Sequence, residues 1–382
     1  MKLIFFLIIE AMLLGLCGGH ACAEEMTETA DTLEKIEDFL NLDEIDKEFP
    51  ELLSGSGDFS FSDTFRKLVK GEMPVDIQRI PSFLSDMFLS ELKQQKQMAL
   101  QILIIVLASA VFSNFIKVFD SSQIADISFY MMYLLISGLL IKSFMTMNQI
   151  VVYTCNSVNL FMKILLPAYL VTVVLCSGSV SALGFYEITV LGISMTQTMI
   201  VRIILPIINF YLMLLILNQM SEEDYFSKFA ELLETVTDWI LKTVTGLIVG
   251  LQAVQCLIAP SVDSLKNTAA QRLAKAIPGI GNILDSAAET VAASALVIKN
   301  AAGIAGILAL VFICLLPVIK LAVCILIFRL LCAVIQPVSE KRMVEGIESI
   351  SRGTVLLLKI LVMSVSVFII SIAMITAAVK GG

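Results

Sequence analysis

The chain has 382 residues, of which 58% are hydrophobic and 16% charged, with a net charge of −8 and a mean hydropathy of +0.90. This composition lies far outside that of soluble globular domains and excludes most soluble enzymes. No basic patch is present, so nucleic acid is not expected as a partner.

The first residues have the pattern of a secretory signal peptide over residues 1–23. Lys2 supplies the positive region, Leu3–Leu16 the apolar core, and Ala21–Ala23 a small-residue cleavage site. Glu10 interrupts the apolar core. An uncleaved N-terminal anchor therefore remains the alternative.

Residues 24–97 are predicted to be an exported acidic segment, on the extracytoplasmic side of the membrane. Between residues 24 and 96 there are 18 acidic and 8 basic side chains, a net of −10, so the acidic balance of the chain belongs to this part. Apolar residues recur at helical spacing on both sides of a break at Ser54–Asp58. We expect a small helical cap that docks on the membrane part or on a partner; a solvated acidic linker is the alternative.

Residues 98–382 are predicted to form an all-α, multi-pass membrane domain with 7–8 membrane segments. About 20 apolar residues cross the hydrocarbon layer, and the candidate segments are 98–118, 127–147, 160–183, 187–217, 238–259, 300–335 and 354–378. Residues 300–335 are too long for one simple crossing, and we expect them to form two helices broken near Pro317.

The positive charges give conflicting indications of orientation. Lys341, Arg342 and Arg352 mark the predicted loop 336–353 as cytoplasmic, and Lys380 suggests the same side for the C-terminus. Both cannot hold if residues 354–378 cross the membrane once.

A shift of 111 residues suggests an internal duplication, as occurs in many transporters. It places Pro167 on Pro278 and Pro206 on Pro317, and it aligns residues 127–147 with 238–258. The alternative is that membrane helices of similar length imitate a repeat.

The polar segment 260–300 carries charges yet is rich in alanine and glycine, and Pro278, Gly279 and Gly281 interrupt its helical pattern. One interpretation is a re-entrant, discontinuous hairpin that lines a polar path. The other is an amphipathic pair of helices at the membrane surface.

Charged residues within apolar runs are candidates for function in a membrane protein. Arg202 and Lys320 lie beside prolines, which favours interior positions, although a structural ion pair is an alternative role for either. Counter-charges are sought in Glu187, Asp285 and Glu289. The candidate pathway or packing residues are Arg202, Pro206, Pro278, Gly279, Gly281, Lys299, Pro317 and Lys320.

Catalytic chemistry is not expected. The one histidine, His20, lies in the predicted signal peptide, and the eight cysteines show no ligand spacing. We therefore predict no catalytic residues, no metal and no cofactor, and no enzymatic activity.

Three stretches carry a resemblance to a known family. They are Lys275-Ala-Ile-Pro-Gly-Ile-Gly-Asn-Ile-Leu-Asp285, Ala295-Leu-Val-Ile-Lys-Asn-Ala-Ala-Gly303 and Gln336-Pro337. With the signal sequence, the acidic exported segment and the spans, the chain resembles the stage III sporulation protein AE family of endospore-forming bacteria. The likeness covers essentially the whole chain.

The resemblance implies a multi-pass protein of the mother-cell membrane around the forespore, in the channel or secretion-like complex that joins the two cells. Its implied partners are other stage III sporulation A proteins and the forespore Q protein; a homo-oligomer is also compatible. A permease-like or channel-forming component and a non-transporting scaffold are the two functions to be weighed. The lipid bilayer is a partner in either case.

Overall fold

The computed structural model describes residues 60–70, 80–117, 122–177, 181–221, 223–274 and 281–378. The predicted signal peptide, the exported segment up to residue 59, and Pro278 and Gly279 lie outside these residues. The described residues form helices joined by turns, with no strand among them, which confirms the all-α class.

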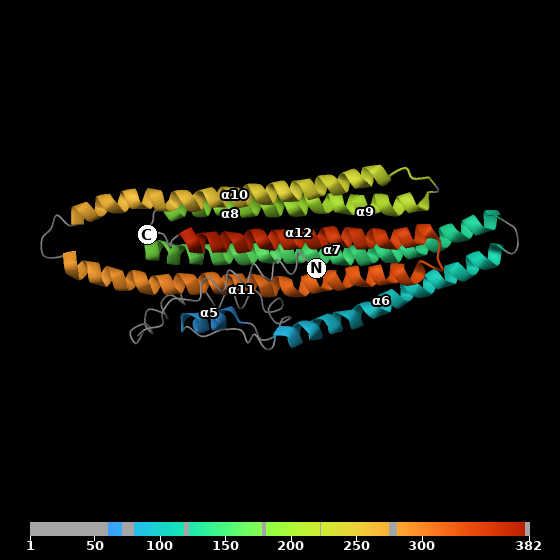
Figure 1. Ribbon diagram of the computed structural model, residues 1–382, viewed down its shortest axis with the longest axis horizontal. Helices are drawn as coiled ribbons and strands as arrows, with labels where there is room; N and C mark the ends of the chain where they lie inside the picture. Colours follow the sequence, from blue (N-terminus) through green and yellow to red (C-terminus); the bar gives the residue numbers. More distant parts are fainter. Residues whose placement is uncertain are drawn as a thin grey trace.

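Six long helical rods run side by side and alternate in direction, and a short helix lies against them (Figure 1). The elements are α5 (Phe61–Val69), α6 (Ile80–Lys117), α7 (Ser122–Ser177), α8 (Ser181–Met199), η1 (Ile200–Ile204), α9 (Leu205–Met220), α10 (Ser227–Ala274), α11 (Gly281–Ile335) and α12 (Lys341–Ala378). The π-helical turn η1 joins α8 and α9 into one rod.

Fewer and longer helices replace the predicted segments. The separate segments 127–147 and 160–183 are wrong, because α7 runs without a break from Ser122 to Ser177. Residues 148–159 between them contain polar side chains but neither proline nor glycine, so nothing ends the helix there. Similarly, α6 starts at Ile80 and passes through the predicted domain boundary at residue 97.

Pro317 and Pro206 have different effects on the helices that contain them. The predicted break near Pro317 is wrong, since Pro317 lies inside α11; a buried proline costs the helix one hydrogen bond, which membrane helices tolerate. Pro206 is the second residue of α9, directly after η1, and the amide of Leu205 donates to the carbonyl of Ile200. Here the helix widens into a π turn and continues.

The polar segment 260–300 is not a separate hairpin or surface pair. Its first part, up to Ala274, is the end of α10, and its second part, from Gly281, is the start of α11. Both predicted helical arms are present, but each arm is an extension of a long rod, and the predicted break at Pro278 and Gly279 lies outside the described residues. In Figure 1 both arms end at the left end of the bundle.

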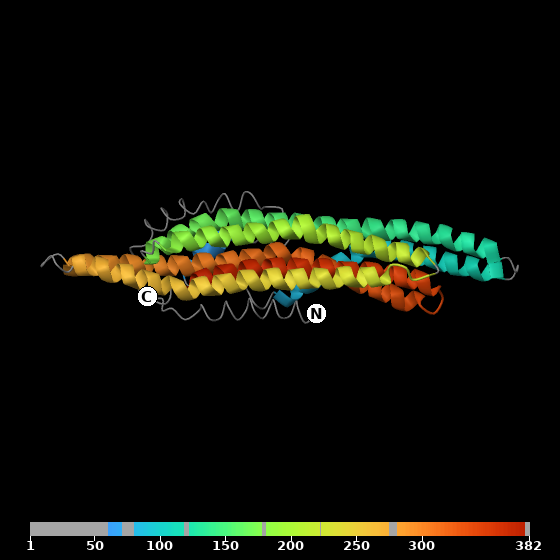
Figure 2. The ribbon, with the colours of Figure 1, turned by 90° about the horizontal axis from the view of Figure 1, so that it is seen from above.

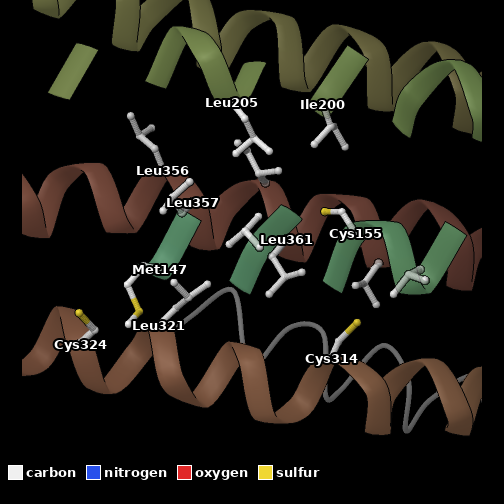
Figure 3. Packing of buried hydrophobic residues seen from close by; sticks show 14 of the residues in the cluster. Met147, Cys155, Ile200, Leu205, Cys314, Leu321, Cys324, Leu356, Leu357 and Leu361 are labelled. Carbon is white, nitrogen blue, oxygen red and sulfur yellow. The ribbon is translucent and has the colours of Figure 1, made fainter. Parts of the chain in front are cut away.

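Helix α12 is the central rod. It packs against α7, α8, α9, α10 and α11, whereas α6 contacts α7 and α11 from the outside. Figure 2 shows the bundle from above, and in Figure 3 Leu356, Leu357 and Leu361 of α12 lie between the rod that carries Leu205 and the rod that carries Leu321. All five leucines are nearly inaccessible to solvent.

Small residues let the central rods approach closely. A Cβ added at Gly306 of α11 would lie 2.7 Å from Cδ2 of Leu165, and one at Gly353 of α12 would lie 2.9 Å from Cε2 of Phe144. Both neighbours belong to α7. Four alanines on the same stretch of α11 are also buried: Ala301, Ala302, Ala305 and Ala309. Small-residue faces of this kind are typical of membrane helix packing.

Helix α5 docks on the bundle, as expected for a helical cap. Ser60 caps its first turn by accepting from the amide of Asp63. Its apolar face, Phe61, Phe65 and Val69, is buried against the bundle, and the ring of Phe61 meets that of Phe161 edge-on at 6.1 Å. The charged side chains of α5 face outward.

The turn between α9 and α10 is held by one buried amide. The side chain of Asn218 accepts from the backbone amide of Phe226 at 2.8 Å and donates to Oδ1 of Asp224 at 2.6 Å. Donation from Asn218, together with Ser227, holds the pKa of Asp224 below its ordinary value. The turn thus carries a charge-assisted hydrogen bond at its centre.

The predicted duplication agrees with the helix boundaries at one end of the bundle only. A shift of 111 residues carries the start of α10 at Ser227 to residue 338, three residues before α12 begins. At the other end Pro167 lies inside α7, whereas its counterpart Pro278 falls between α10 and α11. The duplication stays a prediction.

Candidate functional site: a polar seam inside the bundle

The outer surface of the bundle has the character of a lipid-facing surface. Five helices in the described part of the chain are long and apolar enough to cross a membrane: Pro81–Phe112, Ile127–Pro167, Glu187–Met220, Val297–Ile335 and Lys341–Thr376. Large apolar side chains are exposed along the rods. Exposed apolar surface on this scale is not found on soluble monomers.

Helix α10, which contains the predicted crossing 238–259, is not among these five, yet it has the most informative pattern. Its outer face is an apolar stripe at helical spacing, with these side chains exposed: Phe229, Leu232, Val236, Trp239, Leu247, Leu251, Val254, Leu257 and Ile258. Its inner face carries Thr237 and Gln252, both buried, and Glu234 and Asp238, half-buried. Carboxylates and amides turned inward with apolar residues outward reverse the arrangement of a soluble amphipathic helix.

These inward groups belong to a set of polar residues spread along the interior of the bundle, which we call the polar seam. It passes between α10, the α8–α9 rod, α7 and the central α12. Its members are Cys155, Thr189, Gln197, Tyr211, Glu234, Asp238, Gln252, Gln255, Lys359, Ser364 and Ser371.

One end of the seam is charged. Nζ of Lys359 on α12 donates to both carboxylate oxygens of Asp238 on α10, at 3.0 and 2.9 Å. One turn away, the hydroxyl of Tyr211 donates to Oε2 of Glu234 at 3.0 Å. Both side chains of the ion pair are about a third exposed, so its contribution to stability is modest. The pair joins α10 to α12 across the seam.

The middle of the seam is uncharged. The thiol of Cys155 lies close to the side chains of Gln197 and Ser364. Further along, Nε2 of Gln252 donates to the hydroxyl of Ser371 at 2.6 Å, and that hydroxyl donates to the carbonyl of Val367 at 2.7 Å. These amides and hydroxyls are contributed by α8, α10 and α12.

Beyond the seam, a buried lysine meets the end of α12, and we call this group the Lys299 cluster (Lys299, Tyr169 and Thr376). Nζ of Lys299 donates to the carbonyl of Thr376 at 2.9 Å. The Thr376 hydroxyl donates to the carbonyl of Ile372, so the Tyr169 hydroxyl, 2.5 Å away, donates to Thr376. Thr376 lies in the last described turn of α12, and the C-terminal end of a helix favours a cation.

None of the predicted candidate residues whose side chains are described is a member of the seam. Lys299 comes nearest to it, fully buried in the cluster beyond the end of the seam. Arg202 in η1 and Pro206 are exposed, so the expected interior position of Arg202 is wrong; Lys320 is half-buried and Pro317 is buried within α11. Gly281 is the first residue of α11, while Pro278 and Gly279 lie outside the described residues. Of the predicted counter-charges, Glu187 is exposed, and the side chains of Asp285 and Glu289 are not among those described.

The seam residues Glu234, Asp238, Gln197 and Gln252 were not predicted. The signal that could have found those of α10 is periodicity: Glu234, Asp238, Gln252 and Gln255 recur on the face opposite the apolar stripe. Among the described residues no group of histidine, cysteine, aspartate and glutamate is arranged to hold a metal ion.

Fold and seam together define a class: a helical membrane protein with an apolar outer surface and a polar interior. Within that class, the chain belongs to the stage III sporulation protein AE family, whose model matches residues 59–379. That range begins just before α5 and includes every rod of the bundle.

A curated relative is also similar. The stage III sporulation protein AE of Bacillus subtilis (strain 168) is 24% identical over 261 residues, which cover 68% of this chain and 65% of the relative. No solved structure matches the chain. The protein is thus a sporulation membrane component by family.

Proposed function

We propose that the protein is a permease-like or channel-forming component of the complex that joins mother cell and forespore, and that it has no enzymatic activity. The observation that carries the proposal is the polar seam. Polar and charged groups inside a lipid-facing bundle are costly, and they mark substrate or ion paths in many membrane proteins. The seam residues of α10 extend from Glu234 to Gln255, about 32 Å at ~1.5 Å per residue, close to the ~30 Å hydrocarbon thickness.

In this proposal the protein lies in the mother-cell membrane around the forespore. The segment before α6 is on the extracytoplasmic side and reaches the space between the two membranes. Other stage III sporulation A proteins and the forespore Q protein are the proposed partners. These assignments are supported by family membership and by the resemblance of the whole chain to that family.

A non-transporting scaffold is the second candidate, and one observation favours it. The lysine at the charged end of the seam and the lysine beyond the other end both have structural partners, namely Asp238 for Lys359 and the α12 carbonyl for Lys299. Such pairs hold helices together whether or not anything passes between them. The two candidates therefore differ in what the uncharged middle of the seam does.

Substitutions in the seam separate the two candidates. Gln252→Leu removes an inward amide at nearly unchanged volume, and Arg202→Gln, on the exposed face of η1, is the matched control. In sporulating cells we expect Gln252→Leu to assemble normally but to fail in sporulation, while the control sporulates. Normal sporulation of both variants would remove support for the pathway and leave the scaffold.

The direct assay is reconstitution of the full chain in liposomes with its proposed partners, followed by measurement of solute flux. We expect flux in the wild type and a loss of at least tenfold in Gln252→Leu. Equal flux in liposomes with and without the protein would contradict the permease-like function.

A further inference from the structure

We infer that the middle of the polar seam, where Gln197 and Ser364 meet beside Cys155, is a binding site for small uncharged molecules that donate and accept hydrogen bonds, water among them. The binding site is inferred only from the burial and the hydrogen bonding of these side chains. Its consequence, that the transported solutes are uncharged and polar, rests on the proposed function.

The first observation is a pair of buried side chains that lack strong hydrogen-bond partners. Gln197 is 4% exposed and Ser364 is 2% exposed. Apart from the thiol of Cys155 beside them, both amide atoms of Gln197 and the hydroxyl oxygen of Ser364 have no hydrogen-bond partner in the described part of the chain. Most buried polar side chains in folded proteins do have partners, so such a group of atoms indicates a bound molecule.

The neighbouring thiol supplies only weak hydrogen bonds. Cys155 lies beside Gln197 and Ser364, but a thiol is a weak donor and acceptor. Gln252 lies further along the seam and donates to Ser371. The site therefore presents N–H donors, a hydroxyl and a carbonyl oxygen to a molecule that can both donate and accept.

The charges of the bundle argue that this molecule is neutral. The nearest seam cation along α12 is Lys359, five residues from Ser364, and it is neutralised by Asp238. Lys299 is bound to the carbonyl of Thr376. An ion in the middle of the seam would be desolvated without a counter-charge, which costs several kcal/mol. A neutral polar molecule avoids that cost.

Stability measurements test the binding site. If the polar atoms are dry and unpaired, replacing them with apolar groups of similar size relieves their desolvation penalty and stabilises the protein. If they hold a molecule, the same change removes hydrogen bonds. We therefore expect Gln197→Leu and Ser364→Ala to lower the midpoint of thermal unfolding of the full chain in detergent. A midpoint that is unchanged or higher in both variants overturns the binding site.

Flux measurements test the substrate class in the same liposomes that test the proposed function. The probes are water, glycerol and potassium glutamate, and Gly246→Ala is the control, because a Cβ at Gly246 meets nothing within 4 Å. We expect water or glycerol to enter at least tenfold faster than glutamate, and Gln197→Leu to abolish the difference. Water entry without glycerol entry identifies water as the ligand.

The outcomes are distinguishable. Glutamate flux equal to or faster than that of glycerol overturns the neutral substrate class while the permease-like function stands. No flux of any probe overturns the permease-like function, and the unfolding midpoints then decide the binding site alone.

Discussion

Lys299 is a fully buried charged residue that binds a backbone carbonyl near the end of a neighbouring helix. Its ammonium group donates to a carbonyl in the last turn of α12, and the Tyr169 hydroxyl completes the group through Thr376. Sequence pattern identified Lys299 as a charge inside an apolar run, but not as a partner of a helix terminus. The role of a buried polar side chain depends on which atoms it reaches, and 77 residues separate Lys299 from Thr376.

We predict that both the positive charge and the length of the Lys299 side chain contribute to the free energy of unfolding. Lys299→Met should lower the free energy of unfolding by about 1.5–3 kcal/mol, because it removes a charge-assisted hydrogen bond to a helix terminus. Lys299→Arg should lose less, since it keeps a cation. Thermal unfolding of both variants is the measurement, with Lys320→Met as a control at a half-buried position. A Met variant as stable as the wild type would contradict the structural role.

Asp224 gives the bundle a specific pH dependence. Its pKa is held below the ordinary value by the side chain of Asn218, so the folded state favours the carboxylate. The stability that this provides is present above the unfolded pKa of about 3.9 and is lost as pH falls through the folded pKa. We predict that Asp224→Asn lowers the unfolding midpoint at pH 7 and that the difference from the wild type shrinks below about pH 4.

The Asn218→Ala background provides the control for this prediction. Without the donating amide, the substitution at Asp224 should have little effect at either pH. If Asp224→Asn lowers the midpoint equally in both backgrounds, the hydrogen bond at 2.6 Å is not the cause.

At the scale of elements, the helices pack through glycines at particular positions and not through glycine in general. Cβ atoms at Gly303, Gly306 and Gly353 would clash with side chains of neighbouring rods, whereas those at Gly192 and Gly246 would meet nothing within 4 Å. All five lie in apolar helices and look alike in sequence. Only the positions of neighbouring rods distinguish them.

This difference predicts opposite effects of one substitution. Gly353→Ala should lower the free energy of unfolding by about 1–3 kcal/mol through overpacking against Phe144 and Leu212. Gly246→Ala should raise it by up to about 1 kcal/mol, because alanine is the better helix former. Unfolding of the two variants in the same detergent measures both. A stabilised Gly353→Ala variant would show that α7 and α12 are less closely packed than described.

For the whole molecule, the rods are longer than a bilayer is thick. Helix α7 measures about 84 Å at ~1.5 Å per residue, against ~30 Å of hydrocarbon. Figure 1 shows the α6–α7 end reaching beyond the other turns on the right and the α10–α11 end on the left. A bilayer can therefore enclose only the shared middle of the bundle, where the seam lies.

The rods also resolve the conflict between the orientation indicated by the positive charges of residues 336–353 and that indicated by Lys380. Because α12 is one unbroken helix, the α11–α12 turn and the C-terminal end of α12 lie at opposite ends of the bundle. The α9–α10 and α11–α12 turns lie at the same end (Figure 1). The positive charges of Lys341 and Arg342 favour the cytoplasm for that end.

Labelling of introduced cysteines should report this topology. With the native cysteines replaced by alanine, Glu223→Cys and Ser339→Cys should react with an impermeant thiol reagent only after it enters the cytoplasm. A C-terminal protease site should be cleaved from the other side. Reaction of the two cysteines from opposite sides of the membrane would contradict the arrangement of the rods.

Apolar periodicity by itself determined that the protein is an all-helical membrane protein, because a long apolar run leaves its backbone no partner in lipid except its own helix. The charge distribution placed the acidic balance of the chain before residue 97, and helical periodicity predicted one helix on each side of Pro278, where α10 and α11 lie. Tertiary structure decided where the rods end and which polar residues face inward. Residues 148–159 look polar enough for a loop yet stay helical inside the bundle, and Arg202 looks interior yet faces outward. The seam depends on contacts between residues more than 100 positions apart, such as Asp238 with Lys359 and Gln252 with Ser371. No local pattern encodes such contacts, since they arise only when one helix face is apposed to another.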